Sequence, residues 1–507
     1  MARIARAATL VMAMFVASRL LGLLREIVIG ARFGASADLD AYLAAFRLPD
    51  LLFTVVAGGA LASAFIPTFS ERLALQQEEA AWELAAKVAN LLVLTLTLLA
   101  VLAALLAHPL VEHIIAPGFS AQQQALTVWL MRWMLISTVI FGLSGLVMGV
   151  LNSFQHFLLP ALAPLLYNLA IILAAWLLAP LLGIRALVVG VVGGAAMHLL
   201  IQVPGLLHFG ARWRPSLSLA DAGVREVLRL MAPRVLGLAV VQLNFMVNVF
   251  LASRLPEGSI SALNYAWLIM LLPQGVFAQA IATAAFPTFA HQAALGQRKA
   301  MQETLGRILA LLVFLTVPAS VLLLLLRFPI ISLLLERGAF DAQATRMTGY
   351  ALAFYAPGLV GHAVVEIAAR GFYALKDTRT PVLVGVAAMS ANVVLSLALV
   401  GPLAHGGLAL ANSLATLAEM AALLWLLRRR LGGWQERSVG QSALRTLAAT
   451  VLMAGWIVLL LNRLPAWPGP VLALVVGTSA AVGYGLSAWA LHAPELRSLP
   501  ALLRRGR

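Results

Sequence analysis

The chain of 507 residues contains no cysteine. This absence excludes disulfide bonds, thiolate metal sites and cysteine nucleophiles. The sequence also lacks the short signatures of enzyme sites, such as HExxH, a phosphate-binding loop or a nucleophile beside its base. Its nine histidines do not have the spacing of metal ligands. We therefore expect no enzymatic activity, no metal and no cofactor.

Charged residues are scarce. Only 11% of the residues are charged and 62% are hydrophobic, whereas soluble domains are about a quarter charged and about half apolar. One globular core cannot bury so much apolar surface, so the composition predicts an integral membrane protein. The connecting segments are too short for a soluble domain, which places the function in the membrane or in short loops.

The few charges are mostly positive, with 35 Lys and Arg against 20 Asp and Glu. They are spread over many short loops, which argues against nucleic acid as a partner and is typical of the cytoplasmic loops of membrane proteins. The start, MARIARAATLVMAMFVAS, resembles a signal peptide, but the apolar sequence continues past Arg19. We expect a first helix that is retained.

Apolar stretches of about 20 residues are long enough to cross a membrane, and the sequence predicts about 14 of them. They cover residues 7–31, 40–68, 84–107, 122–150, 160–180, 184–207, 224–253, 260–289, 304–326, 343–372, 381–400, 405–427, 443–462 and 470–491. With both termini in the cytoplasm, roughly three times as many basic residues fall in cytoplasmic loops as in outer loops. We predict that orientation.

The chain contains a weak internal repeat. The similar segments are RLLG at 19–22 and RVLG at 234–237, AFIPTFSE at 64–71 and AAFPTFAH at 284–291, and Pro160 and Pro381 in span-opening positions. Offsets of about 215 to 221 residues predict an all-α polytopic protein with two six-helix lobes, related by a pseudo-two-fold axis along the membrane normal. We expect lobes at 1–215 and 216–432, then two extra helices and a basic cytoplasmic tail at 433–507.

Charged residues occur inside the first two predicted spans, although each costs at least about 2.5–3.5 kcal/mol at mid-bilayer. Arg19, Arg25 and Glu26 cover an arc of about 140° on the first helix, at 100° per residue. Arg47 lies in the second span, with Asp40 seven residues earlier on the same face. This spread is typical of a cavity lining. Guanidinium groups bind phosphate oxygens in a bidentate manner, so the arginines are candidates for binding an anionic substrate.

An alternative interpretation is that these arginines form interhelical locks with Glu26, Asp38, Asp40 and Asp50. The equivalent span of the second lobe, ALNYAWLIMLLPQGVFAQAI, contains no charge, whereas symmetric locking predicts charges in both lobes. We therefore favour substrate binding, with the acids neutralising the arginines when no ligand is bound.

Polar residues in the second lobe are weaker candidates. Asn392 and Ser396 are four residues apart on one helical face, and with Asn244 they form a candidate ion site. No carboxylate accompanies them, so interhelical hydrogen bonds are the alternative. Glu366 lies one turn before Arg370, which predicts a local ion pair.

Long segments are similar to a known family. They are ASRLLGLLREIVIGARFGASADLDAYLAAFRLPDLL at 17–52, APGF at 116–119, LLLERGAFDAQAT at 333–345 and ARGFYALKDTRTPV at 369–382. These segments resemble the MurJ (MviN) family of bacterial lipid II flippases, and the resemblance covers at least residues 8–430. It implies the fold of the multidrug/oligosaccharidyl-lipid/polysaccharide exporters.

The resemblance also implies a function. Such proteins translocate undecaprenyl-pyrophosphate-linked disaccharide-pentapeptide from the cytoplasmic to the outer leaflet of the bacterial inner membrane, for peptidoglycan synthesis. Membrane lipids and cell-wall synthesis machinery are the implied partners, and the last two helices are implied to form a groove for the lipid tail. The residues implied to meet the pyrophosphate, with their polar neighbours, are Arg19, Arg25, Arg47, Ser18, Glu26 and Asp40.

The chain departs from many relatives at four charged positions. Phe53-Thr54 stands where they carry Arg, Gly58 where they carry Glu, and Leu268 and Leu271 where they carry an Arg and a Glu. The balanced loss keeps the net charge of the cavity but removes part of its anion-binding ring. It leaves open the exact substrate and whether sodium, protons or the membrane potential drive the cycle.

Three alternatives to a lipid II flippase follow. The first is a flippase for another undecaprenyl-linked glycan, such as an exopolysaccharide or O-antigen unit. The second is a cation-coupled drug exporter, which three cavity arginines disfavour because such a cavity should be acidic. The third is a scaffold for cell-wall synthesis that transports nothing.

Overall fold

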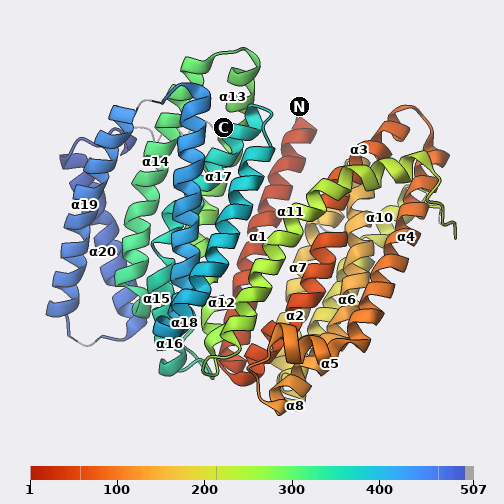
Figure 1. Ribbon diagram of the computed structural model, residues 1–507, viewed down its shortest axis with the longest axis horizontal. Coiled ribbons are helices and arrows are strands. Elements are labelled where there is room, and N and C mark those ends of the chain that lie inside the picture. Colours follow the sequence, from red (N-terminus) through yellow and green to blue (C-terminus); the bar gives the residue numbers. More distant parts are fainter. Residues whose placement is uncertain (1, 58, 213, 435, 466, 497–507) are drawn as a thin grey trace. The chain divides into compact units, whose positions relative to one another are not determined.

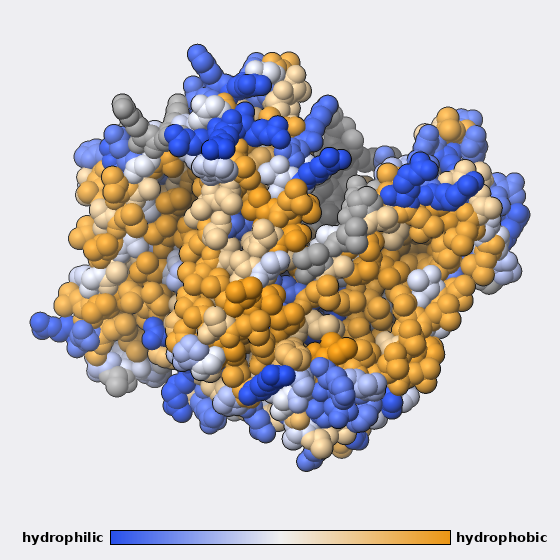
Figure 2. Space-filling model, viewed as in Figure 1, coloured by the Kyte–Doolittle hydropathy of each residue, from blue (hydrophilic) through white to orange (hydrophobic). Residues whose placement is uncertain are grey.

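The computed structural model describes residues 2–57, 59–212, 214–434, 436–465 and 467–496, and helices make up most of them (Figure 1). The chain divides into two compact units. Unit 1 contains Met1–Ile260 and Gly338–Phe340, and unit 2 contains Ser261–Arg337 and Asp341–Arg507. Figure 2 shows apolar residues over the middle of the helices in view and hydrophilic residues at their ends. Helices are suited to the lipid of a membrane, because each helix satisfies its own backbone hydrogen bonds there.

Unit 1 holds the helices of the first seven predicted spans. They are α1 (Ala2–Phe33), α2 (Ala37–Val56), α3 (Gly59–Ala74), α4 (Glu78–Leu105), α5 (Ala107–Leu110), η1 (Val111–Ile115), α6 (Ala121–Ser153), α7 (Leu158–Leu173), η2 (Ala174–Leu178), α8 (Ala179–Leu182), α9 (Arg185–Leu200), α10 (Val203–His208) and α11 (Ala222–Ala252). Helix α2 packs against α6, α1 and α9 pack against α7, and α11 packs against α2 and α3. The predicted lobe boundary at residue 215 stays a prediction, although α11 belongs to unit 1 by its contacts.

Unit 2 holds the later helices, with α12 beginning at the boundary. They are α12 (Ser259–Pro273), η3 (Gln274–Gln279), α13 (Ala280–Ala294), α14 (Arg298–Leu325), α15 (Arg327–Leu334), α16 (Ala342–Tyr355), α17 (Gly358–Ala374), α18 (Arg379–Leu431), α19 (Glu436–Arg463) and α20 (Gly469–Ala490). Helix α18 packs against α16 and α17, α19 against α14, and α20 against α15 and α19. The two extra C-terminal helices are therefore part of unit 2.

The helices agree with an all-α polytopic membrane protein. Among the described residues, nine helices are long and apolar enough to cross a membrane, or up to eleven if each of two bent pairs is one span. Helix α18 is 53 residues long and contains one non-helical residue, Ala404, so it covers the spans predicted at 381–400 and 405–427. A total of about 14 spans is compatible with these helices and stays a prediction.

The internal repeat is also present in the backbone. Residues with positive φ form three pairs: Gln76 (60°) and Gly296 (65°), Gln155 (58°) and Lys376 (60°), and Gly183 (58°) and Ala404 (47°). The members of each pair are about 220 residues apart, which is the offset of the repeated sequence segments. The ψ angles of the third pair also agree, at −142° for Gly183 and −133° for Ala404. The two halves therefore share their turns as well as their spans.

Small residues let α9 approach α7. A Cβ added to Gly190 would lie 2.9 Å from the Cα of Ile171, and one added to Gly194 would lie 3.0 Å from the carbonyl oxygen of Tyr167. Close packing of this kind is common between membrane helices. It fixes the segment of α7 that carries Tyr167.

A row of aromatic side chains packs beside α3 and α4 in unit 1. Ring centroids lie 5.9 Å apart for Phe69 and Trp82, 5.8 Å for Trp82 and Phe154, and 4.5 Å for Phe154 and Phe209. Phe69 is fully buried and Trp82 is nearly so. The row joins α3 and α4 to the segments that follow α6 and α10.

The N-cap residue of α11, Asp221, binds the helix to α3 and α4 of unit 1. Asp221 caps the helix by accepting from the N–H groups of Gly223 at 2.9 Å and Val224 at 3.2 Å, and Lys87 of α4 donates to it at 2.8 Å. The Nη2 of Arg72 on α3 lies 3.6 Å from the Oδ1 of Asp221. The Lys87 ammonium, helped by the two N–H groups, holds the pKa of the Asp221 carboxyl below its usual value of 3.8.

We predict opposite effects for two matched substitutions at the repeated turn. Ala404→Gly should raise the free energy of unfolding by about 1 kcal/mol. The reason is that a positive φ costs a residue with a Cβ roughly 1–2 kcal/mol. Gly183→Ala should lower the free energy of unfolding by a similar amount, since a Cβ there meets nothing within 4 Å and only the backbone conformation changes. Thermal unfolding of the purified protein in detergent measures both. Equal stabilities of the two variants would contradict this account.

We also predict that Asp221→Asn destabilises the protein by about 1–3 kcal/mol at pH 7, since a hydrogen-bonded charge is lost. Because the folded pKa is lowered, the contribution of Asp221 is present above pH 3.8 and is lost as the pH falls through the folded pKa. The difference between wild type and variant should therefore shrink below pH 3.8. Glu79→Gln, which removes an exposed pair with Arg214, is the control and should change little.

Candidate functional site

Arg25 on α1 is held by one carboxylate and one amide. Its Nε and Nη2 donate to Glu26 Oε1 at 3.1 and 2.6 Å, and its Nη1 donates to Asn168 Oδ1 on α7 at 3.0 Å. The side chains of Arg25 and Glu26 keep 26% and 14% exposure. The charge of the guanidinium is thus neutralised by Glu26 of the same helix. Its orientation is held by Asn168 of α7.

Arg19 has a different environment from Arg25. It is exposed on unit 1, and its guanidinium carbon lies 5.2 Å from the centroid of the Phe15 ring, one turn earlier on α1. Ser18 beside it is half-buried. A guanidinium held over an aromatic face can still donate its N–H groups to an anion, so exposed Arg19 is accessible to a ligand.

Helix α2 places its two predicted site residues against later segments of unit 1. Asp40 is buried, and its Oδ2 accepts from the N–H of Gly258 at 2.7 Å. Gly258 has a φ of 86° and passes so close to Ala35 that a Cβ would lie 2.5 Å from its carbonyl oxygen. Arg47 is half-buried, with its guanidinium carbon 5.5 Å from the Phe245 ring centroid on α11.

Gln242 of α11 bridges two residues of α2. Its Nε2 donates to Asp50 Oδ2 at 2.8 Å and to Thr54 Oγ1 at 3.0 Å. Thr54 follows Phe53, whose ring packs 5.7 Å from Phe141. The family resemblance implies an arginine in many relatives where this chain has Phe53-Thr54, and at this position a neutral amide, Gln242, contacts Thr54.

Two tyrosines connect these groups. Tyr42 of α2 and Tyr167 of α7 both lie near Arg25 and Glu26, and Tyr167 also lies near Asp50. Three helices therefore contribute to one polar region of unit 1. We call Arg25, Glu26, Tyr42, Tyr167 and Asn168 the Arg25 cluster.

Four of these polar residues were missed by sequence reasoning, namely Asn168, Gln242, Tyr42 and Tyr167. The available signal was a polar residue inside an apolar stretch, as in LLYNLAII around Asn168. This signal is weak, because most such residues in membrane helices only form interhelical hydrogen bonds.

The candidate ion-site residues form hydrogen bonds within single helices. Ser396 Oγ donates to Asn392 Oδ1 at 3.2 Å on α18, where both side chains are buried. Asn248 Nδ2 donates to Asn244 Oδ1 at 3.0 Å on α11 of unit 1. Ion binding by Asn392, Ser396 and Asn244 stays a prediction.

Other predicted residues have simpler outcomes. The ion pair between Glu366 and Arg370 is confirmed. Leu268 and Leu271 are half-buried on α12. Gly58 lies outside the described residues.

Comparison with known proteins gives one family. The model of the family described as lipid II flippase MurJ matches residues 29–476. The chain is 33% identical over 448 residues to the lipid II flippase MurJ of Burkholderia cenocepacia, covering 86% of each chain. It is 32% identical over 453 residues to the probable lipid II flippase MurJ of Rhizobium tropici, covering 88% of this chain and 85% of the relative.

Solved structures support the fold. A lipid II flippase MurJ in an inward closed conformation matches with a TM-score of 0.82 at 24% identity, covering 97% of this chain and 99% of the other. A multidrug resistance MATE transporter in an inward-facing conformation matches with a TM-score of 0.68 at 15% identity, covering 82% and 94%. The predicted exporter fold is therefore confirmed.

We predict that Gln242→Met destabilises the protein by about 1–3 kcal/mol, because Asp50 loses its amide donor in a half-buried position. Leu243→Met, on the same helix at a site that is 52% exposed, is the control and should stay within about 0.5 kcal/mol of wild type. Thermal unfolding in detergent measures both. Equal unfolding temperatures for Gln242→Met and Leu243→Met would show that the bridge contributes nothing.

Proposed function

Since this chain belongs to the lipid II flippase MurJ family, we propose that it moves lipid II, the undecaprenyl-pyrophosphate-linked peptidoglycan precursor, across the bacterial inner membrane. The observation that carries the proposal is the family match over residues 29–476. A member of a flippase family is a transporter and not an enzyme, and its helices make it a multi-pass membrane protein. We propose transport from the cytoplasmic to the outer leaflet, with both termini in the cytoplasm.

We further propose that the arginines of α1 and α2 bind the pyrophosphate of the substrate. Arg25 supports this role because its present partner, Glu26, is adjacent in sequence and keeps 14% exposure. An incoming pyrophosphate replaces one anion beside the guanidinium by another, so Arg25 stays neutralised throughout. Asn168 holds the third nitrogen of Arg25 during this exchange. In the same proposal Arg19 and Arg47 add guanidinium groups, with Ser18 and Asp40 beside them.

Transport proceeds, in this proposal, by alternating access between the two halves of the fold. The last two helices hold the lipid tail, and cell-wall enzymes act on the product. A charge that crosses the membrane potential exchanges about 2.3 kcal/mol per 100 mV, so the potential can drive the cycle. Sodium binding by Asn392, Ser396 and Asn244, or a flow of protons, is the alternative drive.

The test is complementation of a bacterium depleted of its own lipid II flippase. We expect wild type and Arg463→Ala to restore growth, since Arg463 is an exposed residue at the end of α19. We expect Arg25→Ala and Arg19→Ala to fail, because a guanidinium that contacts the anion is lost. Membrane levels of each variant, measured by immunoblot, separate lost transport from lost protein.

The outcomes distinguish the parts of this proposal. Full rescue by both arginine variants would contradict pyrophosphate binding and leave the flippase function intact. Failure of wild type, at normal membrane levels, would contradict lipid II as substrate.

A second candidate is a flippase for another undecaprenyl-linked glycan. It is favoured by the positions after LPDLL, where Phe53-Thr54 stands in place of the arginine of many relatives and a neutral amide, Gln242, donates to Thr54. Native mass spectrometry with lipid II and with a lipid-linked exopolysaccharide unit decides between the substrates. A cation-coupled drug exporter is disfavoured, because its cavity should be acidic. Here the carboxylate of Glu26 is already paired with Arg25 and leaves no excess negative charge beside it.

A further inference from the structure

Three consecutive arginines end the long helix α18, and they have different surroundings. Arg430 is paired with Asp377, which lies in the turn between α17 and α18, at 3.1 Å. Arg428 and Arg429 line a hollow of about 620 Å³ together with Trp425, Gly432, Gly433 and Trp434. The six lining residues therefore bring two guanidinium groups and two indole rings to one place.

The walls of the hollow are fixed by the end of the helix. The N–H groups of Gly432 and Gly433 both donate to the carbonyl oxygen of Arg428, at 2.9 and 3.0 Å. Their φ angles of 82° and 118° favour glycine, and glycine at both positions leaves this turn without side chains. Gln302 of α14 donates to the carbonyl oxygen of Leu431 at 2.6 Å. These hydrogen bonds hold the backbone of the turn beside the hollow.

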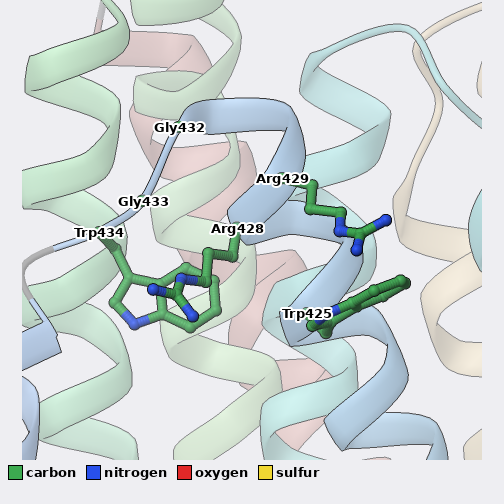
Figure 3. Close-up of a pocket in the computed structure, with 6 residues that line it drawn as sticks. All are labelled: Trp425, Arg428, Arg429, Gly432, Gly433 and Trp434. Atoms are coloured by element: carbon green, nitrogen blue, oxygen red, sulfur yellow. The ribbon is translucent and has the colours of Figure 1, made fainter.

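Each arginine lies with an indole ring at the hollow. The guanidinium carbon of Arg429 is 3.7 Å from the Trp425 ring centroid, and Figure 3 shows the two on one side with Arg428 and Trp434 on the other. A guanidinium that stacks on a ring lies parallel to it. Its N–H groups then point outward, where an anionic oxygen can accept hydrogen bonds from them. Trp425 remains 49% exposed, so the stack is open to a ligand.

The position along the helix identifies the kind of ligand. Helix α18 is apolar enough to cross a membrane, so its last turn lies at the boundary between lipid and water. Tryptophan is enriched at that depth, and arginines there attract anionic lipid headgroups. The helix dipole also favours basic residues in the last turn, but it does not account for two indole rings around a hollow.

We propose that the hollow at the end of α18 binds the phosphate group of an anionic membrane phospholipid. Arg428 and Arg429 donate to the phosphate oxygens, and Trp425 and Trp434 pack against the glycerol and upper acyl chains. The proposal does not depend on the transported substrate, because it involves only the boundary end of one helix in unit 2.

The test is native mass spectrometry of the full-length protein titrated with phosphatidylglycerol or phosphatidylcholine. Replacing both arginines, as Arg428→Gln with Arg429→Gln, should lower the association constant for phosphatidylglycerol by about fivefold for each arginine. Binding of phosphatidylcholine should not change. Arg463→Gln removes an exposed arginine from the end of another membrane helix, α19, and should bind phosphatidylglycerol as wild type does.

Two further arms keep the test decisive. Arg428→Lys with Arg429→Lys retains both charges and should retain most of the phosphatidylglycerol binding, which separates a lost site from a misfolded protein. Inorganic phosphate in place of lipid tests the other source of the same chemistry. Equal affinity of wild type and the double glutamine variant for phosphatidylglycerol would overturn the proposal, and so would wild-type binding of inorganic phosphate as tight as that of phosphatidylglycerol.

Discussion

The high cost of a charge in lipid is the constraint on which the polar structure of this protein depends. Arg25, Asp50 and Asp40 of unit 1 each have a nearby partner that offsets this cost. Glu26 and Asn168 surround Arg25, Gln242 donates to Asp50, and the N–H of Gly258 donates to Asp40. Glu26 is on α1 itself, whereas the other partners come from α7, α11 and the turn before α12, so their contacts also fix the packing of α1 and α2.

The two halves of the fold share a backbone but not a chemistry. Gly183 and Ala404 adopt nearly the same unusual conformation about 220 residues apart, which indicates that the turns were retained after duplication. The span that holds Arg47 and Asp50 in the first half corresponds to α12, η3 and α13, which carry no charged residue. Charges in one copy alone cannot be required by the common fold, and this asymmetry favours a role for Arg47 in binding.

Sequence reasoning predicted the helices well because a membrane span is a local property, set by about 20 apolar residues and their breaks. It also identified Arg25 and Glu26 as residues of a polar face. It could not assign their partners, because the meeting of Asn168 with Arg25 depends on how α7 packs against α1, over 143 residues of chain. The same limit applies to Gln242, which is 192 residues from Asp50. Placement of α11 in unit 1 likewise follows from the tertiary contacts of Asp221 with Lys87 and Arg72.

Arginines with similar sequence surroundings therefore differ in function through their neighbours in space. Arg25 and Arg430 each have a carboxylate within hydrogen-bonding distance, at 2.6 and 3.1 Å. Arg19 and Arg429 are exposed and stacked on aromatic rings instead. A carboxylate partner neutralises the charge inside the protein, whereas an aromatic partner supports the guanidinium and leaves its N–H groups for an anion from outside. On this physical ground Arg19 and Arg429 are better prepared than Arg25 and Arg430 to donate to an anion from outside.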